Sequence, residues 1–255
     1  DMGIFGAGLA TALGSVISLA VMLTHFFRKE NTLQIVRPTH LLRQTKQVLT
    51  SGFSAFFIDV AMGILTIFFN KQIMHYLGAN ALAVYGIIIN ISTFVQCCAY
   101  SVGQAAQPII STNYGAGKGG RIRETLKYAL GTTTFFAIFW TVLSLAVPNG
   151  YIKVFMSPTS EILKIAPGII RSYSISFLLL PLNIFSTYYF QALLKPTAAF
   201  VVSIARGMIL SGLFIFLLPM CFGAGSLWFA MPLTELVIAV YVVYHMRKYT
   251  CTLPE

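Results

Sequence analysis

Residues 81–130 read ALAVYGIIINISTFVQCCAYSVGQAAQPIISTNYGAGKGGRIRETLKYAL, and the distribution of charge around this stretch decides the fold. No charged side chain occurs between Gln72 and Gly117, and that run is far too long for a β-strand. A helix crosses the hydrocarbon core with about 20 apolar residues and satisfies its backbone polar groups internally. The stretch therefore predicts a membrane-spanning helix that ends in a glycine-rich, basic connection.

The glycine-rich connection does not fit a nucleotide-binding loop. Such a loop has a glycine five positions before its Gly-Lys pair and a Ser or Thr directly after it, and it follows a buried strand. Thr112 and Gly119 occupy those two positions here. The sequence therefore argues against an ATPase.

The composition of the whole chain is that of a membrane protein. Its 255 residues are 57% hydrophobic and 9% charged, with a mean hydropathy of +0.79, whereas soluble domains carry about 25% charged residues. We expect an all-α, polytopic membrane helix bundle. Seven spans are predicted, at residues 3–27, 49–70, 79–110, 128–150, 167–190, 197–218 and 224–245.

The formal net charge of +10 follows the predicted topology. If the chain begins outside, the cytoplasmic side holds twelve of the 17 Lys and Arg residues: Arg28, Lys29, Arg37, Arg43, Lys46, Lys118, Arg121, Arg123, Lys127, Lys195, Arg247 and Lys248. The opposite side holds only Lys71, Lys153 and Lys164. This positive-inside bias predicts the orientation and a lipid bilayer as partner, with no nucleic acid.

No catalytic or metal-binding pattern is recognisable. The four cysteines have no metal-ligand or redox spacing, and His25 and His75 lie at span ends without ligand partners. We find no nucleophile–base pair, so we predict neither an enzyme nor a metal or cofactor. No cleavable signal precedes the first span and the chain opens with Asp1, which predicts a fragment.

Charged residues inside spans are the strongest candidates for function, because each costs about 2.5–3.5 kcal/mol at a helix centre. Asp59 and Glu235 are predicted near mid-depth, and Arg206 lies in the cytoplasmic half of its span. One alternative is a buried ion pair between Arg206 and one of the acids. Since one arginine cannot neutralise two acids, the other acid would bind a cation or hold a proton.

Several spans also contain polar residues at helical spacing and prolines, which together suggest a water-filled cavity shared by these spans. The alternative is a purely structural role, in which small and polar side chains hold helices together and the proline kinks do not act as hinges. The candidates for binding substrate or cation are Asn90, Gln104, Gln107, Asn183 and Gln191, in addition to Asp59, Glu235 and Arg206. The candidate hinges are Pro108, Pro181 and Pro232.

These residues lie in segments that resemble the multidrug and toxic compound extrusion (MATE) transporters. The stretch at 81–130 is similar to the eighth helix and following loop of that family, and GIFGAGLATALGSVIS (3–18) to its sixth helix. YYFQALLKPTAAFVVSIARGMIL (188–210) and LPMCFGAGSLWFAMPLTELV (218–237) resemble its tenth-to-eleventh and eleventh-to-twelfth helix regions. The similarity covers essentially the whole chain in the family's order.

The resemblance implies a division of the chain within a twelve-helix, two-lobe fold. Residues 1–28 would be the last helix of the N-terminal lobe, 29–48 the cytoplasmic interlobe linker, 49–248 the C-terminal six-helix lobe and 249–255 a cytoplasmic tail. NYGAGKGGR (113–121) would be a cytoplasmic loop in which Gly and Asn make the turn. The missing N-terminal lobe of the same chain would be a partner.

The resemblance also implies efflux of small amphipathic, often cationic drugs in exchange for sodium ions or protons, by alternating access in the bacterial cytoplasmic membrane. Glu235, Arg206 and Gln191 match places where this branch has similar residues, whereas Asp59 is offset. Residues 167–190 lack the tenth-helix acid of some members, so the coupling site would lie at Asp59 or Glu235 or in the absent lobe. A lipid-linked sugar flippase of the same superfamily and a seven-helix receptor remain alternatives.

Overall fold

The computed structural model describes residues 3–27, 42, 45, 60 and 63–253. The chain divides into two compact units, residues 1–51 and 52–255. In the first unit, helix α1 spans Gly3–Leu23 and a 3-10 turn follows at Thr24–Phe27. The sequence of α1 contains no charged residue, as expected for a helix in an apolar environment.

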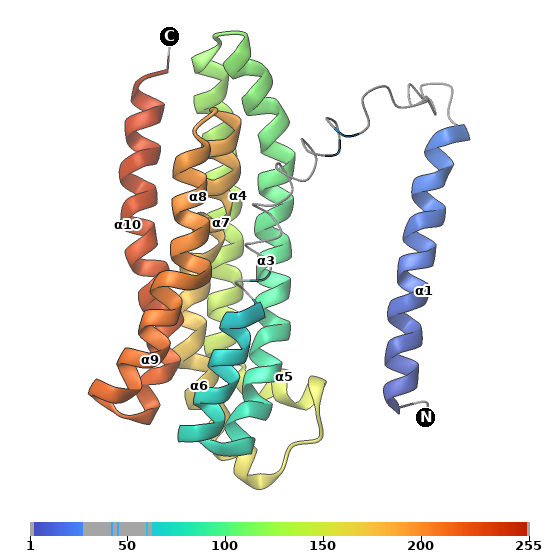
Figure 1. The fold of residues 1–255 in the computed structure, drawn as a ribbon, viewed down its shortest axis with the longest axis vertical. Coiled ribbons are helices and arrows are strands. Elements are labelled where there is room, and N and C mark those ends of the chain that lie inside the picture. The colour runs from blue at the N-terminus through green and yellow to red at the C-terminus, as the bar shows by residue number, and fades with distance from the viewer. Residues whose placement is uncertain (1–2, 28–41, 43–44, 46–59, 61–62, 254–255) are drawn as a thin grey trace. The chain divides into compact units, whose positions relative to one another are not determined.

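The second unit is a bundle of helices, and no β-strand occurs among the residues described (Figure 1). Its first described helical segment covers residues 63–76. The elements that follow are α3 Gly78–Gly115, α4 Gly119–Ala146, α5 Pro148–Phe155, α6 Ser160–Ser174, η2 Ile175–Leu178, α7 Leu180–Ala192, α8 Pro196–Ile204, η3 Ala205–Ile209, α9 Leu210–Phe222, η4 Ala224–Phe229 and α10 Ala230–Cys251. Of these, η2 and η4 are 3-10 helices and η3 is a π-helix.

Five helical stretches of the described chain are long and apolar enough to cross a membrane. They cover residues 78–115, 119–146, 160–192, 196–222 and 224–251, and they correspond to the last five of the seven expected spans. The first expected span appears as α1, in which residues 8–23 form a shorter apolar helix. Most of the second expected span lies outside the described residues.

The connection between α3 and α4 is shorter than the sequence suggested. Only residues 116–118 lie outside helices, so Asn113 belongs to α3 and the expected loop at 113–121 is wrong in extent. Gly117 makes the turn with a φ of 70°, where a side chain would be strained. The 38 residues of α3 extend about 57 Å, whereas the hydrocarbon core is about 30 Å thick. Hydropathy therefore predicts only the part of α3 that lies in the membrane, and the helix continues beyond it.

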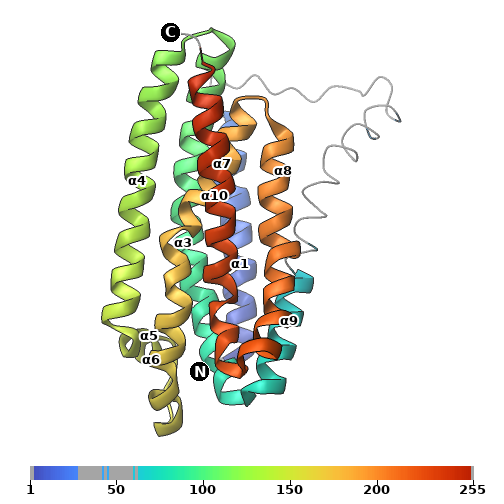
Figure 2. The ribbon, with the colours of Figure 1, turned by 90° about the vertical axis from the view of Figure 1, so that its left-hand side faces the viewer.

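The basic residues gather at one end of the second unit. The α3–α4 turn, the α7–α8 turn and the C-terminal end of α10 lie together there, whereas α5 and the starts of α6 and α10 lie at the other end (Figures 1 and 2). These elements carry the described cations that were assigned to the cytoplasmic side. The distribution agrees with the predicted orientation of the bundle.

Two apolar clusters form the core of this unit. One joins the 63–76 segment, α3 and α6, and includes the stacked rings of Phe69 and Tyr85, whose centroids are 4.6 Å apart. The other joins α3, α4, α7 and α10 around Phe185 and Tyr189. On α10, Ala230 belongs to the first cluster and Ile238 to the second, so the intervening turn passes between them.

The close approach of α3 to α7 generates a first prediction. A Cβ on Gly103 would collide with the Tyr188 ring, whereas one on Gly131 would meet no atom within 4 Å. Gly103→Ala should therefore lower stability by about 1–3 kcal/mol through overpacking. Gly131→Ala should be neutral or stabilising by up to about 1 kcal/mol through helix propensity. Thermal unfolding of the purified protein in detergent measures both, and equal melting temperatures would contradict this packing.

Candidate functional site

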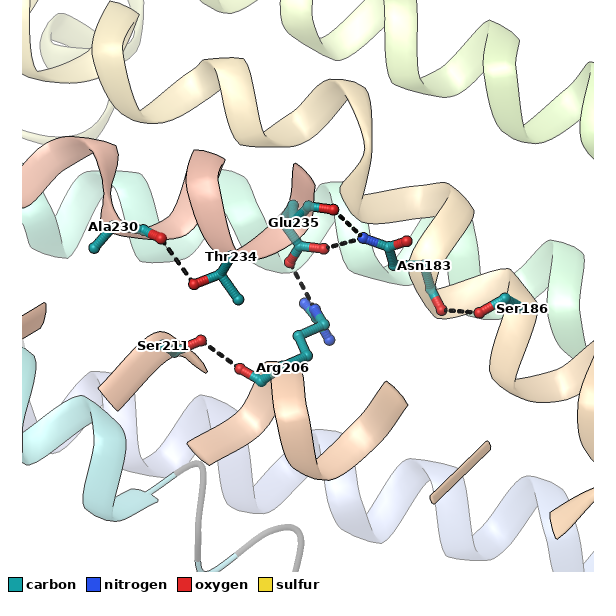
Figure 3. A network of polar contacts seen from close by, with 7 residues as sticks. All are labelled: Asn183, Ser186, Arg206, Ser211, Ala230, Thr234 and Glu235. Carbon is teal, nitrogen blue, oxygen red and sulfur yellow. Dashed lines mark hydrogen bonds and ion pairs between the residues drawn. The ribbon is translucent and has the colours of Figure 1, made fainter. Parts of the chain in front are cut away.

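Three side chains from three helical spans meet in the interior of the second unit (Figure 3). Arg206 Nε donates to Glu235 Oε1 at 2.7 Å, which is the only ion pair among the described residues. Asn183 Nδ2 donates to Glu235 Oε2 at 2.7 Å and to the Glu235 backbone carbonyl at 2.9 Å. We call Asn183, Arg206 and Glu235 the central triad.

Burial makes the interactions of the central triad strong. Glu235 and Asn183 are fully buried, and the Arg206 side chain is only 13% exposed. The carboxylate is stabilised by one charged and one neutral donor, and its negative charge balances the guanidinium in a poorly solvated environment. Removing either charge would leave the other one buried and unpaired, which typically costs about 3–5 kcal/mol.

Each of the three spans changes helical geometry close to the triad. Asn183 lies in the first turn of α7 behind the 3-10 turn η2, and Glu235 lies near the start of α10 behind η4. Arg206 lies in the π-helix η3, and the hydroxyl of Ser211 donates to its backbone carbonyl. Such irregular turns inside helices often mark functional positions, and here they bring the three side chains together.

Arg206 also borders two cavities, which we call cavity A and cavity B. Cavity A has a volume of about 220 Å³ and is lined by Tyr100, Asn183, Ile184, Thr187, Tyr188, Gln191, Val202, Ser203, Arg206 and Gly207. Cavity B has a volume of about 170 Å³ and is lined by Leu65, Thr66, Phe69, Tyr85, Ile89, Ser92, Thr93, Gln96, Tyr173, Ser176, Phe177, Leu180, Arg206 and Met231. Arg206 is the charged residue common to both linings.

The amide of Asn183 has unused hydrogen-bonding capacity. Its Oδ1 atom is buried and has no hydrogen-bond partner among the described residues. The donors on Nδ2 face the carboxylate, so the amide orientation follows from the chemistry of Glu235. Since Asn183 lines cavity A, its Oδ1 can accept from a water molecule or contribute a ligand to a cation there.

The structure brings together some of the other sequence candidates and separates the rest. Gln107 Nε2 donates to Gln191 Oε1 at 3.3 Å, and Gln191 also lines cavity A. Asn90 is exposed and donates to the Gly86 carbonyl of its own helix. Gln104 is exposed and lines neither cavity. Asp59 lies outside the described residues.

The hinge candidates occupy two kinds of position. Pro108 is inside α3, where it removes a backbone donor from a continuous helix. Pro181 and Pro232 lie in the first turns of α7 and α10, where a missing N–H is tolerated. The breaks in these two spans are therefore the 3-10 turns η2 and η4 that precede the prolines.

Sequence reasoning missed Tyr100, Tyr188 and Ser203, which line cavity A. The rings of Tyr100 and Tyr188 meet edge to face, with centroids 6.3 Å apart. With 12 Tyr and 21 Phe residues in the chain, aromatic residues give no local signal for a cavity. The pairing of elements far apart in sequence determines which of them line it.

The described residues contain no group of three or more His, Cys, Asp or Glu side chains able to hold a metal ion. The five long apolar helices and the buried ion pair together define a multi-pass helical membrane protein with the central triad in its interior. The MatE family model matches residues 54–217, and the chain belongs to this family of transporters, which is not a family of enzymes.

Curated relatives and solved structures agree with the family. The chain is similar to the multidrug export protein MepA of Staphylococcus saprophyticus, at 24% identity over 254 residues, and to MepA of Staphylococcus aureus strain NCTC 8325, at 25% over 255 residues. Each alignment covers 97% of this chain and 55% of the relative. The chain therefore spans about half the length of these relatives.

Two solved structures share the fold at low sequence identity. One is a MOP superfamily transporter from Pyrococcus furiosus, with a TM-score of 0.82 at 17% identity, covering 99% of this chain and 58% of that one. The other is the outward-facing conformation of a multidrug resistance MATE family transporter, with a TM-score of 0.81 at 18% identity, covering 98% and 57%. The family match sets aside the seven-helix receptor.

The central triad generates a second prediction. Glu235→Gln should lower the free energy of unfolding by about 3–5 kcal/mol, because it leaves Arg206 buried without a counter-charge. The double variant Arg206→Gln with Glu235→Gln should lose much less than the sum of the two single variants. Thermal and denaturant unfolding in detergent would measure this double-mutant cycle.

The matched control is the exposed contact between Asn80 and Glu161, in which Nδ2 donates to Oε2 at 2.8 Å. Glu161→Gln should change stability by less than about 1 kcal/mol, because both groups can bond to water instead. Additive losses for Arg206 and Glu235 would show that the two charges do not stabilise each other.

Proposed function

We propose that this chain is the C-terminal half of a secondary active multidrug exporter with two six-helix lobes. In this proposal the exporter lies in a bacterial cytoplasmic membrane and expels amphipathic, often cationic compounds in exchange for sodium ions or protons. The observation that carries the proposal is the central triad, a buried charged network that joins the irregular turns of three spans and borders two cavities. The family match and the names of the relatives support it.

Alternating access needs helices that move as segments on either side of the binding region. The turns η2, η3 and η4 divide three spans into such segments, and the triad links the segments where they meet. A charged network of this kind favours a small number of discrete arrangements, because intermediate positions leave charges unpaired. We infer that the triad holds one of the two access states, and that drug and coupling ion favour different states.

The acid that carries the coupling ion is Asp59 in this proposal. Asp59 and Glu235 are the two acids within the expected spans, and the structure pairs Glu235 with Arg206. Both carboxylate oxygens of Glu235 already accept hydrogen bonds and Arg206 balances the negative charge, so a sodium ion there would compete with Arg206. This favours Asp59 over Glu235 as the acid that binds the coupling ion. In the same proposal, residues 29–48 are the linker to the other lobe.

Drug binding requires more space than the two cavities beside the central triad provide. Drug-sized ligands occupy pockets of about 300–1,000 Å³, whereas cavities A and B have volumes of about 220 and 170 Å³. These cavities suit water, an ion or one group of a larger molecule. The drug site would therefore form between this lobe and its partner lobe, with Arg206 and Gln191 among the residues reachable from cavity A.

The lipid-linked sugar flippase remains a second candidate because of the charge that the cavities expose. Among the residues that line cavities A and B, Arg206 is the charged one and no acid is present. A positive group at that position would suit a pyrophosphate better than a cationic drug. Dye efflux from cells and flipping of a labelled lipid-linked sugar in proteoliposomes distinguish the two functions.

The third prediction concerns Asp59. In the complete transporter, Asp59→Asn should reduce ethidium efflux driven by an imposed sodium or proton gradient at least tenfold, because the coupling ion loses its charged ligand. Fluorescence measured in everted membrane vesicles, with each gradient imposed separately, also identifies the ion.

Glu161→Gln serves as the matched control, since Glu161 lies at the opposite end from the basic turns and accepts a hydrogen bond from the exposed Asn80. It should leave gradient-driven efflux unchanged. Wild-type efflux by the Asp59→Asn variant, with the same dependence on both gradients, would place the coupling site elsewhere.

A further inference from the structure

A groove runs along the outer face of the second unit between α4 and α10. Helices α4 and α10 both contact α7 and η2, which form the floor of the groove. Its main part has a volume of about 810 Å³ and is lined by Leu179, Leu182, Leu236, Ala239, Val240, Val243, Tyr244, Arg247, Lys248 and Cys251. An adjoining hollow shares Leu182, Val243, Arg247 and Cys251 and reaches Leu126 and Leu130 of α4. We call the two together the α4–α10 groove; Figure 2 shows the course of α4 and α10.

The groove is apolar along its length and basic at one end. Leu236, Val240 and Val243 recur on one face of α10 at helical spacing and are each at least 38% exposed. Arg247 and Lys248 follow at the end that carries the other basic turns. Leu236 and Lys248 are separated by about 18 Å along the helix, and one leaflet's half of the hydrocarbon core measures about 15 Å.

The two cations at the end of the groove are not engaged by the described part of the protein. Arg247 and Lys248 are exposed and form no ion pair or hydrogen bond with described residues. Other basic groups at this end have partners: Arg123 Nη2 donates to the Leu253 carbonyl, and Lys195 Nζ lies 5.6 Å from the centre of the Tyr249 ring. No acid occurs among the residues that line the groove.

We propose that the α4–α10 groove binds an anionic phospholipid. Its phosphate contacts Arg247 and Lys248 at the membrane surface, and one acyl chain lies along Leu236, Val240 and Val243. A phospholipid with net negative charge matches both the apolar depth of the groove and its unpaired cations, whereas a neutral zwitterionic lipid matches only the depth. The site is distinct from the central triad and does not depend on which substrate the transporter carries.

Native mass spectrometry of the complete transporter tests this site. The protein is reconstituted into vesicles of equal parts phosphatidylglycerol and phosphatidylcholine and then released into detergent, and the retained lipids are counted. Wild-type protein should retain phosphatidylglycerol preferentially. Arg247→Gln combined with Lys248→Gln should reduce the retained ratio about tenfold, from the attraction of two surface cations to anionic lipid.

The matched control removes two exposed cations from the opposite end, with Lys153→Gln and Lys164→Gln. It should leave the ratio unchanged. Val240→Trp should fill the groove and reduce retention of phosphatidylglycerol while both cations remain. Equal retention of the two lipids by wild-type protein, or equal effects of the two cation pairs, would overturn the proposal. So would unchanged retention by Val240→Trp.

Alkylation of natural cysteines distinguishes lipid from protein as the occupant of the groove. Cys251 lines the groove, and Cys97 and Cys221 are exposed elsewhere and serve as internal references. In nanodiscs, phosphatidylglycerol should slow alkylation of Cys251 relative to phosphatidylcholine, with no change at the two references. Equal protection of Cys251 in both lipids and in lipid-free detergent would show that a protein segment covers the groove, and would overturn the proposal.

Discussion

The buried carboxylate of Glu235 is the constraint on which the interior of this bundle depends. A charge at this position is tolerated because Arg206 balances it and each carboxylate oxygen accepts a hydrogen bond, one from Arg206 and one from Asn183. Both partners come from other spans, so the chemistry of one side chain fixes the relative positions of three helices. The triad lies between the two apolar clusters of the core, and its polar contacts specify how the segments meet.

The geometry that satisfies Glu235 also accounts for the irregular turns around it. Arg206 lies in a π-helix and its side chain reaches Glu235 of α10. The Ser211 hydroxyl donates a hydrogen bond to the backbone carbonyl of Arg206. The 3-10 turns before α7 and α10 end one helical segment and start another close to the triad. A transporter that opens alternately to the two sides of the membrane needs helices divided into segments that can move separately. Here the divisions lie beside the charged contacts, which can hold the segments in one arrangement or release them.

Hydropathy and charge predicted the helical membrane fold and the last five spans, because both properties are local. The same local signal placed the start of the fourth span at 128, although α4 begins at Gly119, since a helix can continue beyond the membrane without apolar residues. An ion pair between Arg206 and one of two acids was among the alternatives. The structure shows that Glu235 is the partner of Arg206, that Asn183 contacts Glu235 from 52 residues away and that Arg206 lies in a π-helix. These features depend on tertiary packing, which no short stretch of sequence encodes.

An experimental structure of the complete transporter by electron cryomicroscopy, with side chains visible, tests the central claim most directly. We expect Arg206 Nε within hydrogen-bonding distance of one Glu235 carboxylate oxygen and Asn183 Nδ2 on the other, with helical breaks at η2, η3 and η4. A structure in which Arg206 points away from Glu235, and a sodium ion or water molecules occupy its place on the carboxylate, would show that the central triad does not hold the three spans together. In that case Glu235, and not Asp59, would be the acid available to the coupling ion.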